Sequence, residues 1–195
     1  MPTTAKPSSA TDLALIAVFA ALIAAFSLTP AIPIGPVPVT LQTLAVVLAG
    51  LVLGPWRGFL ATLLYLVVGF AGLPVFAGGA AGVAVLAGPS VGYLLAFPFG
   101  AALAGALAQA FAGWRGAAQY LGFFLAGFAA SLLIHAAGIL GLMIVLHLGF
   151  PAAFMVDLAF WPGDLAKAFA AAAIAVAVHK AFPALLVARR PAMVG

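Results

Sequence analysis

Charged residues are scarce in this sequence. It has no cysteine and no glutamate, and charged residues make up 5% of its 195 positions, whereas 67% are hydrophobic. A water-soluble domain of this length needs far more polar surface. The absence of cysteine excludes disulfides, thiol nucleophiles and cysteine-based metal sites. The composition therefore predicts a protein that is embedded in a lipid bilayer.

The sequence also lacks the phosphate-binding loop of nucleotide hydrolases and the His-Glu-x-x-His motif of metalloproteases. Uphill transport of a solute would therefore need an ion gradient or a partner subunit as its source of energy. The net charge of +4 could suggest a nucleic-acid partner, but the basic residues are scattered singly between apolar runs. Nucleic-acid sites need a basic patch. We expect no nucleic-acid partner, no metal and no cofactor.

Apolar runs long enough to cross a bilayer recur along the chain. About 17 to 25 apolar residues are needed for about 30 Å of hydrocarbon. Run length and punctuation by Pro, Gly, Arg and Trp predict an all-α polytopic membrane protein, with one membrane domain over 1–195 and six transmembrane helices. The fifth run is expected to form one tilted or overlong helix. The six expected spans are about 12–29, 38–54, 58–72, 91–112, 117–148 and 164–187.

The basic residues predict the orientation of these spans. Cytoplasmic loops of membrane proteins are enriched in Lys and Arg. A cytoplasmic N-terminus leaves Lys167 as the only basic residue outside, and both tails, 1–11 and 188–195, then lie in the cytoplasm. The first span is long for a signal peptide and lacks a clear cleavage site, so we expect it to be retained. The basic residues expected inside are Lys6, Arg57, Arg115, Lys180, Arg189 and Arg190.

Three segments on the expected outer side interrupt the helical pattern. Residues 29–43 carry four prolines between Pro30 and Pro38 and must be extended or turning. Residues 72–93 are apolar but rich in Gly and Pro, and residues 148–164 are aromatic. Irregular backbone survives at membrane depth only where protein covers it or where it lines a cavity. The three segments could roof a pocket, or lie on the interface without a ligand.

An acid and a base lie three residues apart in "FWPGDLAKAF", residues 160–169. After Pro162 and Gly163, Asp164 is expected to be a helix N-cap, and Lys167 projects from the same helix face. Capping does not explain a lysine near the positive end of a helix, although snorkelling or a simple ion pair would. An inward-facing ionisable pair is typical of a ligand site. It suits a small molecule with N–H donors and a carboxylate.

Other polar residues in the spans have two interpretations each. Thr40, Gln42 and Thr43 begin the second span on the outer side, where they could bind a ligand or only other helices. Tyr93 follows the glycine-rich segment, and it and Tyr65 could contact a ligand or pack with a satisfied hydroxyl.

His135 lies in the middle of the fifth span, where a satisfied core histidine is a better interpretation than a proton relay. His147 and Asp157 are interpreted as residues of the membrane interface. An intramembrane enzyme could use Asp164 or His135 as an acid or base, but it needs a second catalytic group within reach. A scaffold subunit without a ligand is the third possibility.

Small residues recur on one face of the first span. Ala17, Ala21 and Ala25 follow one another at intervals of four residues. Such faces let helices approach closely in lipid. The face predicts a docking surface for a partner helix, or else reflects the high alanine content of the chain.

Four motifs in order resemble the BioY family, the substrate-binding S component of biotin transporters of the energy-coupling-factor type. They are "PVPVTLQTLAVVLAGLVLGPWRG", "YLVVGFAGLPVFAGG", "LAGPSVGYLLAF" and "PGDLAKA", and the resemblance runs from about residue 13 to 187. It implies a six-helix protein of the bacterial cytoplasmic membrane that binds biotin from outside and is not an enzyme. It also implies a transmembrane coupling subunit and two cytoplasmic ATPase subunits as partners.

The resemblance also implies roles for single residues. Asp164 and Lys167 would bind the ureido and carboxylate ends of biotin, and the face of Ala17 and Ala21 would dock the coupling subunit. Ala80 and Leu94 stand where some relatives have Asn and Arg, so those two contacts are missing here. The chain is then expected to rely more on Gly78, Gly79, Tyr93 and Gln42.

Overall fold

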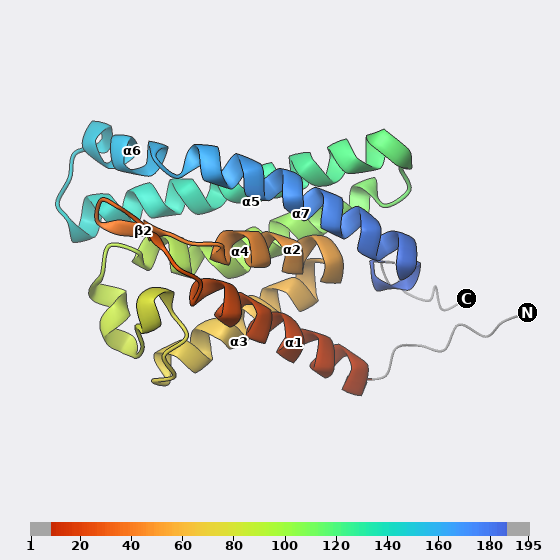
Figure 1. The fold of residues 1–195 in the computed structure, drawn as a ribbon, viewed down its shortest axis with the longest axis horizontal. Helices are drawn as coiled ribbons and strands as arrows, with labels where there is room; N and C mark the ends of the chain where they lie inside the picture. The colour runs from red at the N-terminus through yellow and green to blue at the C-terminus, as the bar shows by residue number, and fades with distance from the viewer. Residues whose placement is uncertain (1–8, 187–195) are drawn as a thin grey trace, which may run out of the picture.

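A computed structural model describes residues 9–186, and these are almost entirely helical apart from one short hairpin and irregular loops (Figure 1). Most of the two expected tails, including Lys6, Arg189 and Arg190, lies outside the described residues. The α-helices are α1 (Ser9–Ser27), α2 (Gln42–Leu53), α3 (Pro55–Phe70), α4 (Val91–Phe111), α5 (Gly116–Val145), α6 (Phe150–Leu158) and α7 (Trp161–Ala181).

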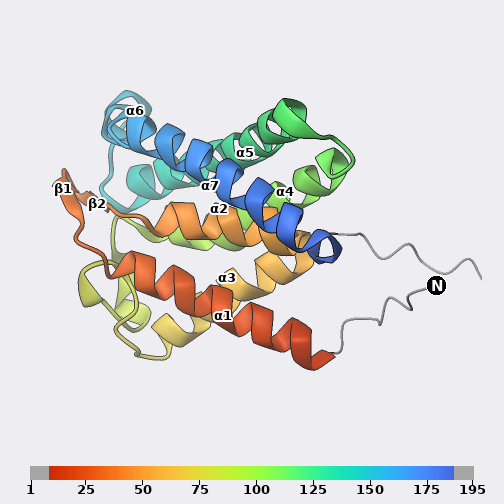
Figure 2. The ribbon, with the colours of Figure 1, turned by 45° about the vertical axis from the view of Figure 1, so that its right-hand side comes forward.

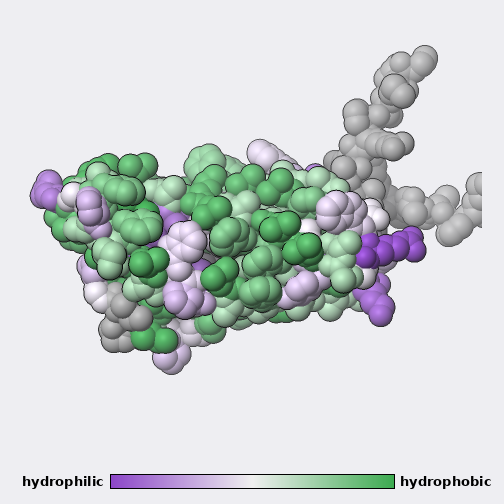
Figure 3. Space-filling view, turned by 90° about the horizontal axis from the view of Figure 1, so that it is seen from above, coloured by the Kyte–Doolittle hydropathy of each residue, from purple (hydrophilic) through white to green (hydrophobic). Residues whose placement is uncertain are grey.

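Four of the described helices, α1, α4, α5 and α7, are long and apolar enough to cross a membrane. The fifth expected run is a single helix of 30 residues, as predicted. The second expected span begins too early, because residues 38–41 belong to a hairpin and a loop and α2 has only 12 residues. Hydrophobic side chains cover most of the face in Figure 3, and the strongly hydrophilic ones lie near its two ends.

The helices form three layers, with α2 and α4 between the pair α1 and α3 and the pair α5 and α7 (Figures 1 and 2). Small residues allow the central helices to touch. A Cβ at Gly50 would lie 2.1 Å from the carbonyl oxygen of Ala101, and one at Gly92 would lie 2.2 Å from that of Ala137. Because α1 packs mainly against α3 and α2, it leaves an outer face free.

The three irregular segments gather at one end of the bundle (Figure 2). The proline-rich segment forms an antiparallel hairpin of β1 (Ile32–Ile34) and β2 (Val37–Val39), so its predicted extended conformation is confirmed. The loop between α3 and α4 contains two 3-10 turns, η1 (Ala77–Gly79) and η2 (Val83–Ala87). The third segment is mainly the short helix α6. The start of α1 and the last 3-10 turn, η3 (Pro183–Leu185), lie at the opposite end.

Candidate ligand site

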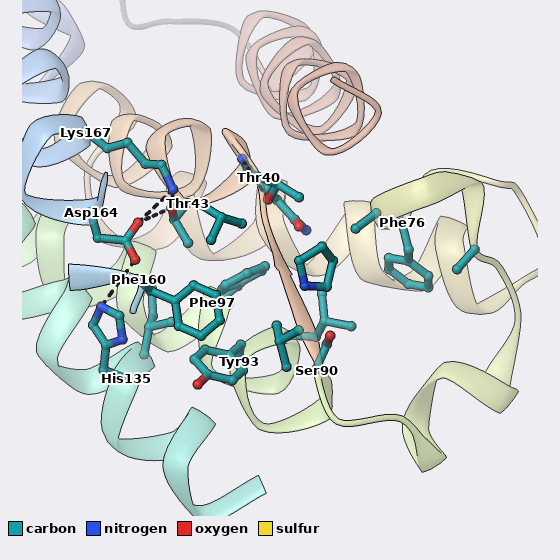
Figure 4. A pocket seen from close by; sticks show the side chains of 18 of the residues that line it. Thr40, Thr43, Phe76, Ser90, Tyr93, Phe97, His135, Phe160, Asp164 and Lys167 are labelled. Atoms are coloured by element: carbon teal, nitrogen blue, oxygen red, sulfur yellow. Dashed lines mark hydrogen bonds and ion pairs between the residues drawn. The ribbon is translucent and has the colours of Figure 1, made fainter. Parts of the chain in front are cut away.

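A cavity of about 160 Å³ lies under the hairpin and the α3–α4 loop. This is several times the space that one buried water needs. Figure 4 shows the acidic and basic side chains at one end of it and Phe76 at the other. The polar lining residues are Thr40, Gln42, Thr43, Ser90, Tyr93, His135, Asp164 and Lys167, and the large apolar ones include Val37, Val39, Phe76, Leu94, Phe97, Ile134 and Phe160.

Asp164 and Lys167 point into this cavity from the first turns of α7. The Lys167 ammonium donates to Asp164 Oδ1 at 2.9 Å and to Thr43 Oγ1 at 3.0 Å. Thr43 in turn donates to the same carboxylate oxygen at 2.7 Å. The two charged side chains are only 10% and 12% exposed, so they form a largely buried pair that faces the cavity.

The predicted capping role of Asp164 is wrong. α7 begins at Trp161, with Phe160 as its N-cap, and Pro162 fits in the first turn because no helical partner is needed for its missing N–H. The Asp164 amide already donates to the Phe160 carbonyl within the helix. Its carboxylate is therefore free to bond side chains on α2 and α5 instead of its own backbone.

His135 lies on α5 between two carboxylates. Its Nδ1 is 2.8 Å from Asp157 Oδ1, and its Nε2 is 3.3 Å from Asp164 Oδ2. The predicted satisfied histidine is confirmed, yet it also borders the cavity. Asp157 is fully buried, so its interpretation as an interface residue is wrong: α6 turns it inward beneath Tyr93 and His135. His147 is exposed at the end of α5.

Tyr93 and Gln42 both line the cavity, but each has a polar partner elsewhere. The Tyr93 hydroxyl donates to Asp157 Oδ1 at 2.8 Å and points away from the side of Thr40 and Phe76 (Figure 4). The Gln42 amide donates to Tyr65 at 2.7 Å, which donates to a loop carbonyl, that of Val75. Tyr93 therefore offers its ring to a ligand, and Gln42 ties α2 to the roof.

Gly78 and Gly79 are not among the residues that line the cavity, although their neighbours Ala77 and Ala80 are. Both glycines have positive φ angles, 69° and 77°. Glycine is the residue that best fits a backbone turn with φ above zero, which accounts for both positions. The structure does not bring either glycine to the site. Ala80 and Leu94 do line it, which leaves apolar wall at both positions.

Ser90 also lines the cavity, and residues 88–92 read Gly-Pro-Ser-Val-Gly. A nucleophilic serine in this pattern sits on a sharp turn from a strand to a helix. Here Ser90 is the N-cap of α4 and follows a 3-10 turn instead. The hydrogen bonds of the described residues include none between Ser90 and a histidine.

The predicted docking residues Ala17, Ala21 and Ala25 are all exposed on the outer face of α1, whereas Ala20 is buried against the bundle. The face is therefore open to another helix or to lipid.

Fold and site together define a multi-pass helical membrane protein with a small-molecule cavity at one end of the bundle. The chain belongs to the BioY family, whose family model matches residues 1–184.

Two relatives are similar over nearly their whole length. The chain is 43% identical to the biotin transporter BioY of Rhizobium etli, with 91% of this chain and 97% of that protein covered. It is 38% identical to the biotin transporter BioY of Rhodobacter capsulatus, with 91% and 98% covered. A crystal structure of the S-component for biotin from an ECF-type ABC transporter matches with a TM-score of 0.82 and 27% identity, over 92% of this chain and 95% of that one.

Proposed function

We propose that this chain is a biotin-binding membrane subunit that mediates biotin uptake, with energy supplied by an ATPase coupling module. Family membership, the relatives named as biotin transporters and the matching S-component support this. The observation that carries the proposal is the largely buried pair of Asp164 and Lys167 at one end of a largely apolar cavity. The relatives' names describe transporters, so they give no support to the enzyme or the scaffold alternative.

The geometry supports a particular recognition of the ligand. Asp164 and Lys167 touch each other, so they present an acceptor and a donor side by side. The ureido ring of biotin carries N–H donors next to a carbonyl acceptor, which matches this arrangement. Splitting the pair between the ureido and carboxylate ends would first have to break the 2.9 Å contact. We therefore favour the ureido ring as the group that meets both side chains, with the aliphatic part against the aromatic walls.

The partners of the subunit follow from the same proposal. A transmembrane coupling subunit and two cytoplasmic ATPases would complete the transporter, because the sequence has no phosphate-binding loop of its own. The exposed alanines of α1, Ala17, Ala21 and Ala25, suit close contact with a helix of the coupling subunit.

For the topology we propose six spans, α1 to α5 and α7, in the bacterial cytoplasmic membrane with both termini inside. α2 is short, but it is buried along almost its whole length, so protein rather than lipid surrounds it. This arrangement puts the cavity and Lys167 on the outer side and Arg57 and Arg115 on the inner side, in line with the usual bias of basic residues.

Calorimetric titration of the purified protein with biotin tests the function, and Lys167→Met tests the site. Loss of the charge-assisted hydrogen bond should weaken binding by at least about tenfold. Lys180→Met is the matched control, because Lys180 lies on the same helix but is exposed, and it should bind like the wild type. Biotin methyl ester keeps the ureido ring, so Lys167→Met should weaken its binding equally. Unchanged affinity in Lys167→Met would remove the site assignment.

A further inference from the structure

Both ring nitrogens of His135 face carboxylate oxygens. Nδ1 lies 2.8 Å from Asp157 Oδ1, and Nε2 lies 3.3 Å from Asp164 Oδ2. An ionised carboxylate only accepts hydrogen bonds, and a neutral imidazole carries a proton on one nitrogen only. If both aspartates are ionised, both contacts can be hydrogen bonds only when both nitrogens are protonated.

The surroundings of Asp157 fit an ionised carboxylate. It is fully buried, and a buried charge needs donors. Oδ1 accepts from the Tyr93 hydroxyl at 2.8 Å, and Oδ2 accepts from the Trp161 indole at 2.9 Å. With His135, three donors from α4, α5 and α7 converge on this one side chain of α6.

Asp164 is supplied with donors in the same way. Its Oδ1 accepts from Thr43 and Lys167, and its Oδ2 faces His135. A cationic ring is further favoured by Trp161, whose indole stacks on His135 with centroids 5.1 Å apart and planes 18° apart. An aromatic face at that distance attracts a cation.

The charges of the cluster then balance. Asp157 and Asp164 supply two negative charges, and His135 and Lys167 supply two positive ones. Among the described residues, Tyr93 of α4 is a further titratable group that faces the ring, and α2 contributes the uncharged Thr43. A group of buried charges between membrane helices is tolerated when it is paired in this way.

We propose that His135 is held as an imidazolium between Asp157 and Asp164 and positions Asp164 for the ligand, with Asp157 as its anchor on α6. The inference rests on the proposed function only for the identity of the ligand. It makes Asp157, which is not among the cavity-lining residues, a positioning residue of the site. It also makes ligand binding sensitive to the protonation of one histidine.

The protonation can be measured directly. In protein labelled with ¹⁵N-histidine, long-range NMR correlations should show one histidine with two protonated ring nitrogens at neutral pH, and His135→Gln should remove that signal. His147→Asn is the control, because His147 is exposed with φ of 53° and Asn tolerates this conformation; it should keep the signal. A neutral tautomer at His135 would overturn the proposal.

Binding gives the functional test. When pH rises and the ring loses a proton, it can donate to only one of the two carboxylates, and wild-type biotin affinity should fall by at least about tenfold. In His135→Gln the affinity should be lower at neutral pH and independent of this titration. If His135→Gln keeps the pH profile of the wild type, the proposal is contradicted. That result would indicate a purely structural role, which lowers the affinity without altering its pH dependence.

A second variant keeps the test available if His135→Gln does not fold. Asp157→Asn retains the size of the side chain but removes its charge, and the imidazolium signal should weaken at the same pH. A signal of full strength in Asp157→Asn would refute the anchoring role. If wild-type protein binds no biotin, the proposed function fails, while the NMR result still decides the state of His135.

Discussion

Replacing Gly138 with alanine should push Tyr93 into the cavity. A Cβ at position 138 would lie 2.1 Å from Cε1 and 2.3 Å from Cζ of the Tyr93 ring, whereas ordinary contact begins at 3.4 Å. The ring must therefore retreat by about 1.3 Å. A shift of this size is enough to break the 2.8 Å hydrogen bond from Tyr93 to Asp157.

Two free-energy terms set the size of the effect. Overpacking a core costs about 1–3 kcal/mol, and losing a hydrogen bond to a charged group costs about 1.5–3 kcal/mol. Because the ring can move into an open cavity, part of the strain is relieved, and we expect a loss of about 2 kcal/mol in stability. For a chain of this size that is a fall in Tm of about 4–8 °C.

Binding should suffer more than stability, because the displaced ring occupies ligand space. Biotin affinity should fall by at least about tenfold in calorimetric titration. Gly113→Ala is the control: a Cβ there meets nothing within 4 Å, so both quantities should stay unchanged. Combining Gly138→Ala with Tyr93→Ala should cost less than the sum of the two single variants. Additive losses, or a silent Gly138→Ala, would refute this account of the cavity wall.

Two further substitutions separate ligand binding from stability. Thr43→Val removes a hydroxyl that bridges Asp164 and Lys167, but those two keep their direct 2.9 Å contact. Calorimetric titration should therefore show only a several-fold loss of biotin affinity, about 1 kcal/mol. A loss as large as that of Lys167→Met would contradict this expectation. Arg57→Met removes the ion pair with Asp12 at 3.2 Å and the hydrogen bond from Arg57 to the Leu185 carbonyl, in the 3-10 turn after α7. Thermal unfolding should show a Tm lower by about 2–4 °C, and biotin affinity should be unchanged. Weakened binding in Arg57→Met would show that the inner end of the bundle controls the cavity.

Local sequence rules were sufficient for the long helices and for one half of the charged cluster, but not for the start of α2 or for the short helix α6. Apolar run length predicted a helical membrane protein, and the i, i+3 spacing put Asp164 and Lys167 on one face of α7. The prolines of the first outer segment predicted extended chain, which the hairpin confirms. Helix starts were harder: Pro162 was taken as an interruption, but at the second position of a helix it costs no hydrogen bond.

Tertiary contacts were out of reach for the same rules. Asp157 is isolated in an apolar stretch, and its partners Tyr93 and His135 lie 64 and 22 residues away. The turn between α5 and α6 brings Asp157 to His135, and the packing of α4 against α5 brings Tyr93 to both. The sequence nevertheless held one clue to the pair of Asp157 and His135. An acid in an apolar segment of a membrane protein needs a partner, and His135 was a titratable residue to which no partner had been assigned.

The pairing of the acids explains why so few charges are enough in this chain. An unpaired carboxylate among membrane helices is costly, and each of the three aspartates has a cationic neighbour: Arg57 for Asp12, His135 for Asp157 and Lys167 for Asp164. The three pairs differ in their access to the cavity. Asp164 and Lys167 line the cavity, so a ligand can compete for their hydrogen bonds. Asp157 is enclosed by its three donors, so it can only hold its neighbours in position. The pair of Asp12 and Arg57 lies at the opposite end and joins α1 to the start of α3. The same chemistry therefore supports ligand binding and positioning at the cavity end of the bundle, and helix assembly at the opposite end.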